Sequence, residues 1–278
     1  MTDSAAIPLP SPVAILGGGS MGGAVLTGLR AAGVPDLRVT TRTATRALEG
    51  AAGLQVLVAD RDPDANRSAV RGARLVVVAV KPAGVPALLA EIADALDPGA
   101  VVVSVAAGVP IATMAAALPS GTSVLRAMPN TPSAVGAGVT GVAAAPGTAE
   151  ADTAAVVAAF RTVGTVVQVT EDRIDALSAV SGSGPAYVYL VLERFIDAAV
   201  RLGFAPEEAA ELVVGTAEGA LRLLSATGEE PAELRRRVTS PKGTTERAVA
   251  VFEQHDLGAI FDEALAAAIA RAKEIAAG

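Results

Sequence analysis

A glycine-rich turn near the start of the chain is the first feature whose residue types and spacing could do chemistry. Gly17, Gly19 and Gly22 follow a short apolar run and open a helical pattern in the order G-x-G-x-x-G, with Ser20 and Met21 between them. Such a turn lets the backbone approach a pyrophosphate, and the helix that follows offers free N–H groups and a positive dipole end. The pattern predicts a dinucleotide site at the first strand–helix crossover; a plain tight turn is the alternative.

The residues roughly twenty positions further on indicate which dinucleotide binds. An NAD site usually has Asp or Glu there, which accepts a hydrogen bond from the ribose 2′-hydroxyl. This chain instead has Thr41, Arg42, Thr43 and Arg46. Because arginine binds phosphate in a bidentate fork, these residues favour NADP(H) and leave NAD(H) open as a second cofactor. The alternative is that both arginines are solvated surface charges.

Three further loops follow expected strands, and their residues are expected to line the nicotinamide side of the same crevice. The carboxyl ends of parallel strands meet at one edge of a sheet, where ligands bind. Asn130 is the best candidate for a hydrogen-bonding role, whereas Lys81 could equally be a surface cation. The loops contain Ala79, Val80, Lys81 and Pro82; Ala106, Ala107 and Gly108; and Met128 to Pro132.

A second polar segment, Ser240 to Glu246, ends one predicted helix and begins another. Its hydroxyl groups and the free N–H groups of a helix start would make an anion site suited to a carboxylate. The alternative is an ordinary helix start with a threonine at the N-cap and Glu246 in the first turn. The residues alone leave both interpretations open.

The elements that must position these residues follow from hydrophobic periodicity. Short Val-rich runs alternate with Ala-rich helical segments as far as Thr170, which predicts a parallel sheet covered by helices on both faces. After Thr170 only helical patterns remain. We therefore predict a Rossmann-like doubly wound α/β domain over residues 1–170, with a flexible tail at 1–11, and an all-helical domain over 171–278. The predicted strands are Val13–Leu16, Leu37–Thr41, Leu54–Ala59, Leu75–Val80, Val101–Val105, Val124–Met128, Val139–Ala143 and Thr165–Val169. The predicted helices are Ser20–Ala32, Tyr187–Leu202, 206–226 and Pro231–Val238, followed by one or two helices from 245 to the end.

Composition excludes several classes of function. The chain has no cysteine and one histidine, so disulfides, thiolate nucleophiles and His-rich metal sites are excluded. A net charge of −7 argues against nucleic-acid binding. The uncharged stretch from Ala100 to Leu125 contains prolines and glycines that interrupt any membrane helix, and the start has no basic signal region. We expect a cytoplasmic protein that takes a small-molecule substrate.

The residues also offer no obvious base for oxidising an alcohol. His255 lies in a polar stretch, lysine occurs only at 81, 242 and 273, and Tyr187 and Tyr189 lie on a helix expected to be core. An imine can take its proton from solvent or a hydroxyl group, so the chain favours reduction of a carbon–nitrogen double bond. The wide apolar stripes of the helical half further predict a homodimer.

These motifs together resemble the pyrroline-5-carboxylate reductase family. The resemblance covers Val13 to Ile275 and is most specific in Ser181-Gly-Ser-Gly-Pro-Ala186 and Val238-Thr-Ser-Pro-x-Gly-Thr-Thr245. It implies NAD(P)H-dependent reduction of 1-pyrroline-5-carboxylate to L-proline, the final step of proline biosynthesis, by hydride transfer to the imine carbon. It also implies dimers paired through the helical domain, commonly assembled into decamers.

The resemblance further assigns individual residues. Ser240, Lys242, Gly243, Thr244 and Thr245 would bind the substrate carboxylate, with Thr245 as the catalytic hydrogen-bond partner of the ring nitrogen. Asn66 would lie on the adenosine side, while Ala106, Ala107 and Asn130 would flank the nicotinamide. Many members of the family have glycine at the position of Lys242, so the role of this side chain stays open, as does whether the loop serves its own chain or a partner.

Two other functions compete with this one. A β-hydroxyacid dehydrogenase shares the nucleotide domain followed by helices, but it would require a catalytic lysine early in the second half, and none occurs between residues 171 and 241. A non-catalytic NADP(H)-sensing protein would not need the hydroxyl-rich loop at 240–245.

Overall fold

The computed structural model describes residues 8–43 and 53–277. By their contacts the residues form two compact units: the first runs to Ser183 and includes the end of the chain from Ala268, and the second is Gly184–Ala267. The first unit therefore extends beyond Thr170 and takes in the last turns of the C-terminal helix. Most of the predicted tail, residues 1–7, lies outside the described part.

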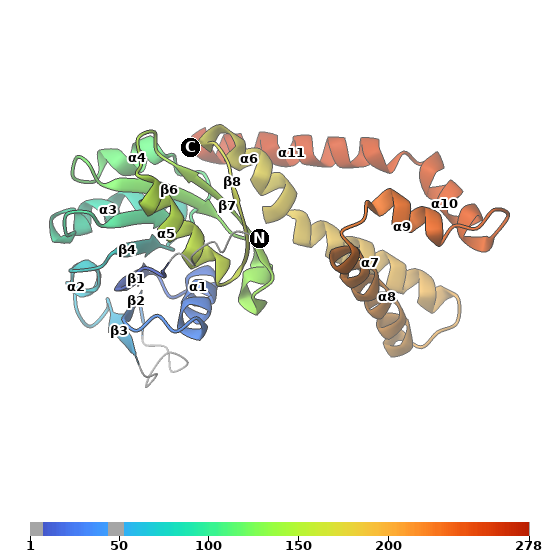
Figure 1. The fold of residues 1–278 in the computed structure, drawn as a ribbon, viewed down its shortest axis with the longest axis horizontal. Coiled ribbons are helices and arrows are strands. Elements are labelled where there is room, and N and C mark those ends of the chain that lie inside the picture. Colours follow the sequence, from blue (N-terminus) through green and yellow to red (C-terminus); the bar gives the residue numbers. More distant parts are fainter. Residues whose placement is uncertain (1–7, 44–52, 278) are drawn as a thin grey trace. The chain divides into compact units, whose positions relative to one another are not determined.

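The first unit is built on an eight-stranded sheet in the order β3-β2-β1-β4-β5-β6-β7-β8 (Figure 1). β1 lies between β2 and β4, with Val13 in register with Leu37 on one side and Leu75 on the other. This order confirms the predicted Rossmann-like fold. The strands are β1 (Val13–Leu16), β2 (Leu37–Thr41), β3 (Leu54–Val58), β4 (Leu75–Val78), β5 (Val101–Ser104), β6 (Ser123–Met128), β7 (Gly138–Ala144) and β8 (Gly164–Gln168).

Helices cover both faces of this sheet, which is why its strands are continuous apolar runs. Val13 and Ile15 pack on one face with residues of α1 and α5, and Ala14 and Leu16 pack on the other with residues of α2, α3 and α4. The alternation follows from the two-residue period of a strand. The helices are α1 (Ser20–Ala31), α2 (Ala65–Val70), α3 (Val85–Ile92), α4 (Ile111–Ala116), α5 (Glu150–Arg161) and α6 (Ile174–Leu177).

The last two strands, β7 and β8, run opposite to the other six. β7 pairs antiparallel with β6, with Met128 opposite Gly141, and it pairs parallel with β8. The connection between β6 and β7 contains only a short 3₁₀ turn, η4 (Thr131–Val135), followed by Gly136 at φ +72°. A parallel neighbour would need a crossover of a dozen or more residues. The predicted parallel sheet is therefore confirmed at every pair except this one.

The second unit consists of helices with little core of their own. Its buried cluster comprises Ala199, Ala209 and Val213, and many large apolar side chains on its helices are exposed within the single chain. Tyr189, expected in the core, is 61% exposed, and Tyr187 is half-buried. Among the described residues, none of the helices combines the length and the hydrophobicity that a membrane span requires. The helices are α7 (Gly184–Arg201), α8 (Pro206–Thr227), α9 (Pro231–Arg237), α10 (Thr244–Gln254) and α11 (Leu257–Ala277), the last continuing into the first unit.

Candidate active site

The glycine turn joins β1 to α1 and is held against β2 and β4. The Thr40 carbonyl oxygen accepts hydrogen bonds from the N–H groups of Gly17 (3.1 Å) and Gly18 (2.8 Å). Gly17 has φ +107°, and a Cβ there would lie 2.7 Å from the Ala79 carbonyl oxygen. A Cβ on Gly22 would lie 2.0 Å from the Gly17 carbonyl oxygen. The fold itself therefore requires glycine at positions 17 and 22.

Gly19 is different, because no steric contact with the described residues requires a glycine there. Its φ of −74° suits any residue, and a Cβ there would have no heavy atom of the described residues within 4 Å. Gly19 is also the N-cap of α1, and it lines a cavity. A cradle of backbone N–H groups at a helix N-terminus, kept free of a side chain, is what a pyrophosphate needs. The turn therefore fits the predicted dinucleotide.

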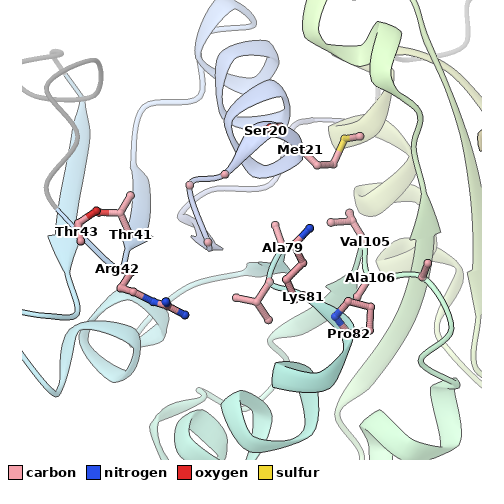
Figure 2. A pocket seen from close by; sticks show the side chains of 15 residues that line it. Ser20, Met21, Thr41, Arg42, Thr43, Ala79, Lys81, Pro82, Val105 and Ala106 are labelled. Carbon is pink, nitrogen blue, oxygen red and sulfur yellow. The ribbon is translucent and has the colours of Figure 1, made fainter. Parts of the chain in front are cut away.

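The cavity has a volume of about 670 Å³ and lies at the carboxyl ends of β1, β2, β4 and β5. Figure 2 shows Arg42 and Lys81 in it, with Ser20 and Met21 at the start of α1. The structure thus brings together most of the residues predicted to bind the cofactor. They are Gly17, Gly19, Ser20, Met21, Thr41, Arg42, Thr43, Ala79, Val80, Lys81, Pro82, Ala106 and Ala107; Gly18 and Val105 also line the cavity.

The remaining predicted cofactor residues lie elsewhere or are not described. Gly22 packs against the turn, and Gly108 lines a neighbouring cavity of about 250 Å³ within the first unit. Asn66 lines a cavity of about 290 Å³ beside Arg42, where its Nδ2 donates to Glu91 Oε1 at 3.1 Å. Arg46 lies outside the described residues.

Asn130 braces the end of β6 in this structure. It is 7% exposed; its Oδ1 accepts from the Val139 N–H at 2.8 Å, and its Nδ2 donates to the Ser181 carbonyl oxygen at 2.9 Å. These bonds tie the turn before β7 to the π-helical segment Ser178–Gly182. Asn130 is not among the residues lining the 670 Å³ cavity, so contact with a nicotinamide stays a prediction.

The loop that carries Ala106 and Ala107 is held from both ends. The fully buried Ser104 accepts a hydrogen bond through its Oγ from the Ala106 N–H at 3.2 Å. At the other end, Glu171 Oε1 accepts two hydrogen bonds, one from the Ile111 N–H at 2.7 Å and one from Arg126 Nη1 at 3.1 Å. The ion pair between buried Arg126 and partly exposed Glu171 therefore positions the start of α4 and the loop before it.

The polar loop of the second unit begins helix α10. Gly243 is the N-cap, so the alternative of a threonine at the cap is wrong. Lys242 adopts φ +61°, a left-handed conformation that glycine accepts without strain, and its N–H donates to Glu246 Oε2 at 2.9 Å. A Cβ on Gly243 would lie 2.8 Å from Ser240 Oγ. The tight turn thus places Ser240 beside the first N–H groups of the helix.

The described residues hold no group of three or more His, Asp or Glu side chains that could bind a metal ion. The fold and the glycine turn define a dinucleotide-binding oxidoreductase of the doubly wound α/β class, with a helical second unit.

Comparisons with known proteins narrow this class. Residues 171–275 match the family model described as pyrroline-5-carboxylate reductase dimerisation, and residues 12–108 match the one described as NADP oxidoreductase coenzyme F420-dependent. The chain is 38% identical over 265 residues to pyrroline-5-carboxylate reductase of Pseudomonas aeruginosa, covering 95% of this chain and 96% of the relative.

Two solved structures are similar over nearly the whole chain. A pyrroline-5-carboxylate reductase from Coxiella burnetii matches with a TM-score of 0.88 and 37% identity, over 95% of this chain and 97% of the other. Plasmodium falciparum pyrroline carboxylate reductase, solved with NADP bound, matches with a TM-score of 0.82 and 25% identity, over 97% and 100% of the two chains. This chain belongs to the pyrroline-5-carboxylate reductase family.

Proposed function

We propose that the protein reduces 1-pyrroline-5-carboxylate to L-proline with NADPH, the last step of proline biosynthesis. The observation that carries this proposal is Gly19, whose missing side chain leaves open the space at the N-terminus of α1 that a pyrophosphate needs. Family membership supplies the substrate, and Arg42 in the same cavity supports the phosphorylated cofactor.

The cofactor would be held along the 670 Å³ cavity. The first-turn N–H groups of α1 would bind the pyrophosphate, and the Arg42 guanidinium, with Thr41 and Thr43, would bind the 2′-phosphate. The Ala106–Ala107 backbone would support the nicotinamide. When bound, NADPH supplies the hydride that reduces the carbon–nitrogen double bond.

The loop from Ser240 to Thr245 would bind the substrate. Ser240 and the free N–H groups that begin α10 are suited to a carboxylate, and the Thr245 hydroxyl would donate a hydrogen bond to the ring nitrogen. Reduction adds a hydride to the imine carbon and a proton, drawn from solvent, to the nitrogen. Because the chain then needs no strong base, positioning and electrostatic complementarity supply most of the catalysis.

We also propose that the enzyme is cytoplasmic and forms a homodimer through its helical half, with decamers as the larger assembly. The apolar side chains exposed on α7 and α8, such as Leu190 and Leu221, and the match to a dimerisation family model support pairing. A monomeric mass by light scattering at micromolar concentration would contradict it.

The activity is tested by following NADPH consumption with 1-pyrroline-5-carboxylate, and NADP⁺ reduction with 3-hydroxyisobutyrate as the hydroxyacid alternative. We expect turnover with the first substrate only. Thr245→Val keeps the shape of the side chain and removes its hydroxyl, so it should lower kcat, whereas Thr245→Ser should retain most of it. Equal kcat for wild type and Thr245→Val would remove this hydroxyl from the mechanism.

A further inference from the structure

The carboxylate of Asp60 lies on the side of the site where the adenosine is expected, although the sequence pattern indicates no acidic residue there. The cavity of about 290 Å³ beside the glycine turn shares Gly17, Thr41, Arg42 and Val80 with the larger cavity, and its other lining residues include Asp60 and Asn66. The acid of an NAD fingerprint is expected at the end of the second strand. Here the end of β2 carries Arg42, and an acid reaches the same cavity from the end of β3.

The backbone of the sheet places these two residues side by side. β2 and β3 are parallel, and beyond the strand ends the ladder continues, with the Ala59 N–H donating to the Thr41 carbonyl oxygen at 2.9 Å. The Asp60 N–H donates to the Arg42 carbonyl oxygen at 3.1 Å. Asp60 is therefore fixed next to Arg42 by main-chain hydrogen bonds, which do not depend on either side chain.

The Arg42 and Asp60 side chains form no ion pair with each other. Within the described residues, neither the Arg42 guanidinium nor the Asp60 carboxylate makes an ion pair or a side-chain hydrogen bond, and both residues are exposed. By contrast, the amide of Asn66 in the same cavity is engaged by Glu91. The cavity thus offers a free cation and a free anion to whatever occupies it.

We propose that Asp60 is a specificity-determining residue that opposes Arg42 in the choice between NADPH and NADH. Its carboxylate accepts a hydrogen bond from an unphosphorylated ribose hydroxyl and repels a 2′-phosphate, while Arg42 does the reverse. This inference rests on the proposed function, because it requires a dinucleotide in the cavity. The consequence is an enzyme that uses NADH alongside NADPH.

The test is the ratio of the dissociation constants of NADH and NADPH, measured with the purified full chain by the fluorescence of the reduced nicotinamide. Asp60→Asn keeps the size of the side chain and removes its charge. We expect this variant to bind NADPH more tightly and NADH more weakly than the wild type. The ratio should rise about fivefold at low salt and less at high salt, because salt screens exposed charges. Arg42→Gln should lower the ratio.

Asp97→Asn is the matched control, because it removes the same charge from an exposed carboxylate that lines neither cavity. We expect its ratio to equal that of the wild type. A ratio in Asp60→Asn that is unchanged, or matched by Asp97→Asn, would overturn the role of Asp60 while leaving the proposed function intact. A wild-type chain that binds neither cofactor would instead overturn the proposed function itself.

Discussion

Two glycines of the same turn should respond in opposite ways to the same added methyl group. In Gly22→Ala the new Cβ would lie 2.0 Å from the Gly17 carbonyl oxygen, a backbone atom fixed by the turn, so the turn or α1 must shift. Overpacking of this kind costs about 2 kcal/mol or more. For a chain of this size, that loss corresponds to a fall in the thermal midpoint of roughly 4–8 °C.

Gly19→Ala should leave the fold intact and damage cofactor binding. No described protein atom lies within 4 Å of the added Cβ, and φ is already −74°, so the loss of stability should be at most about 1 kcal/mol, the cost of placing alanine at a helix N-cap. A pyrophosphate seated on the first N–H groups of α1 would meet the methyl group directly. We expect the affinity for NADPH to fall roughly tenfold to a hundredfold.

The assay pairs thermal unfolding with titration of NADPH. The chain contains no tryptophan, so the fluorescence of the reduced nicotinamide reports binding without interference from one. Gly23→Ala serves as a control, since its added Cβ also has no atom of the described part of the chain within 4 Å and Gly23 does not line the cavity. If folded Gly19→Ala binds NADPH as tightly as the wild type, the pyrophosphate does not sit on this turn and the reasoning fails.

Three further perturbations test the contacts that hold the site. Lys242→Gly relieves a left-handed backbone at φ +61° and should raise the free energy of unfolding by about 0.5–1 kcal/mol; a lower urea midpoint would contradict this. Glu171→Ala leaves the buried Arg126 without its carboxylate and should cost about 2–4 kcal/mol in the same measurement, with a smaller loss in Glu171→Gln. Arg67 lowers the pKa of Asp94, chiefly through its hydrogen bond. The Asp94 carboxylate therefore stabilises the fold above its ordinary pKa, and this contribution is lost as the pH falls through the lowered pKa. Below about pH 4, the free energy of unfolding of Asp94→Asn should therefore depend less on pH than that of the wild type.

Local patterns in the sequence were sufficient for the strands, the glycine turn and most of the residues lining the cavity. A Val-rich run between turn residues specifies a buried strand by its own periodicity. Because the strands are parallel, the loops after Leu16, Thr41 and Val78 all lie at the same edge of the sheet, whichever strands are neighbours. The glycine spacing is likewise a local signal, because a tight turn and a helix start are made by neighbouring residues.

The sequence did not indicate features that depend on distant residues. The direction of β7 follows from the short turn after Asn130, yet a strand pattern reads the same in either direction. Asp60 resembles any exposed carboxylate until the register of β3 against β2 places it beside Arg42.

The sequence by itself therefore determined the family, the chemistry of the nucleotide turn and the order of its elements, since these are set by residues close together along the chain. Only the tertiary structure decided which glycines of the turn the fold requires, because Gly17 and Gly22 meet backbone atoms that Gly19 does not. It alone showed that the polar ends of Asn130 bind backbone groups of two other elements. The physical reason is that steric exclusion and hydrogen bonding act between atoms close in space, and the sequence orders residues only along one dimension.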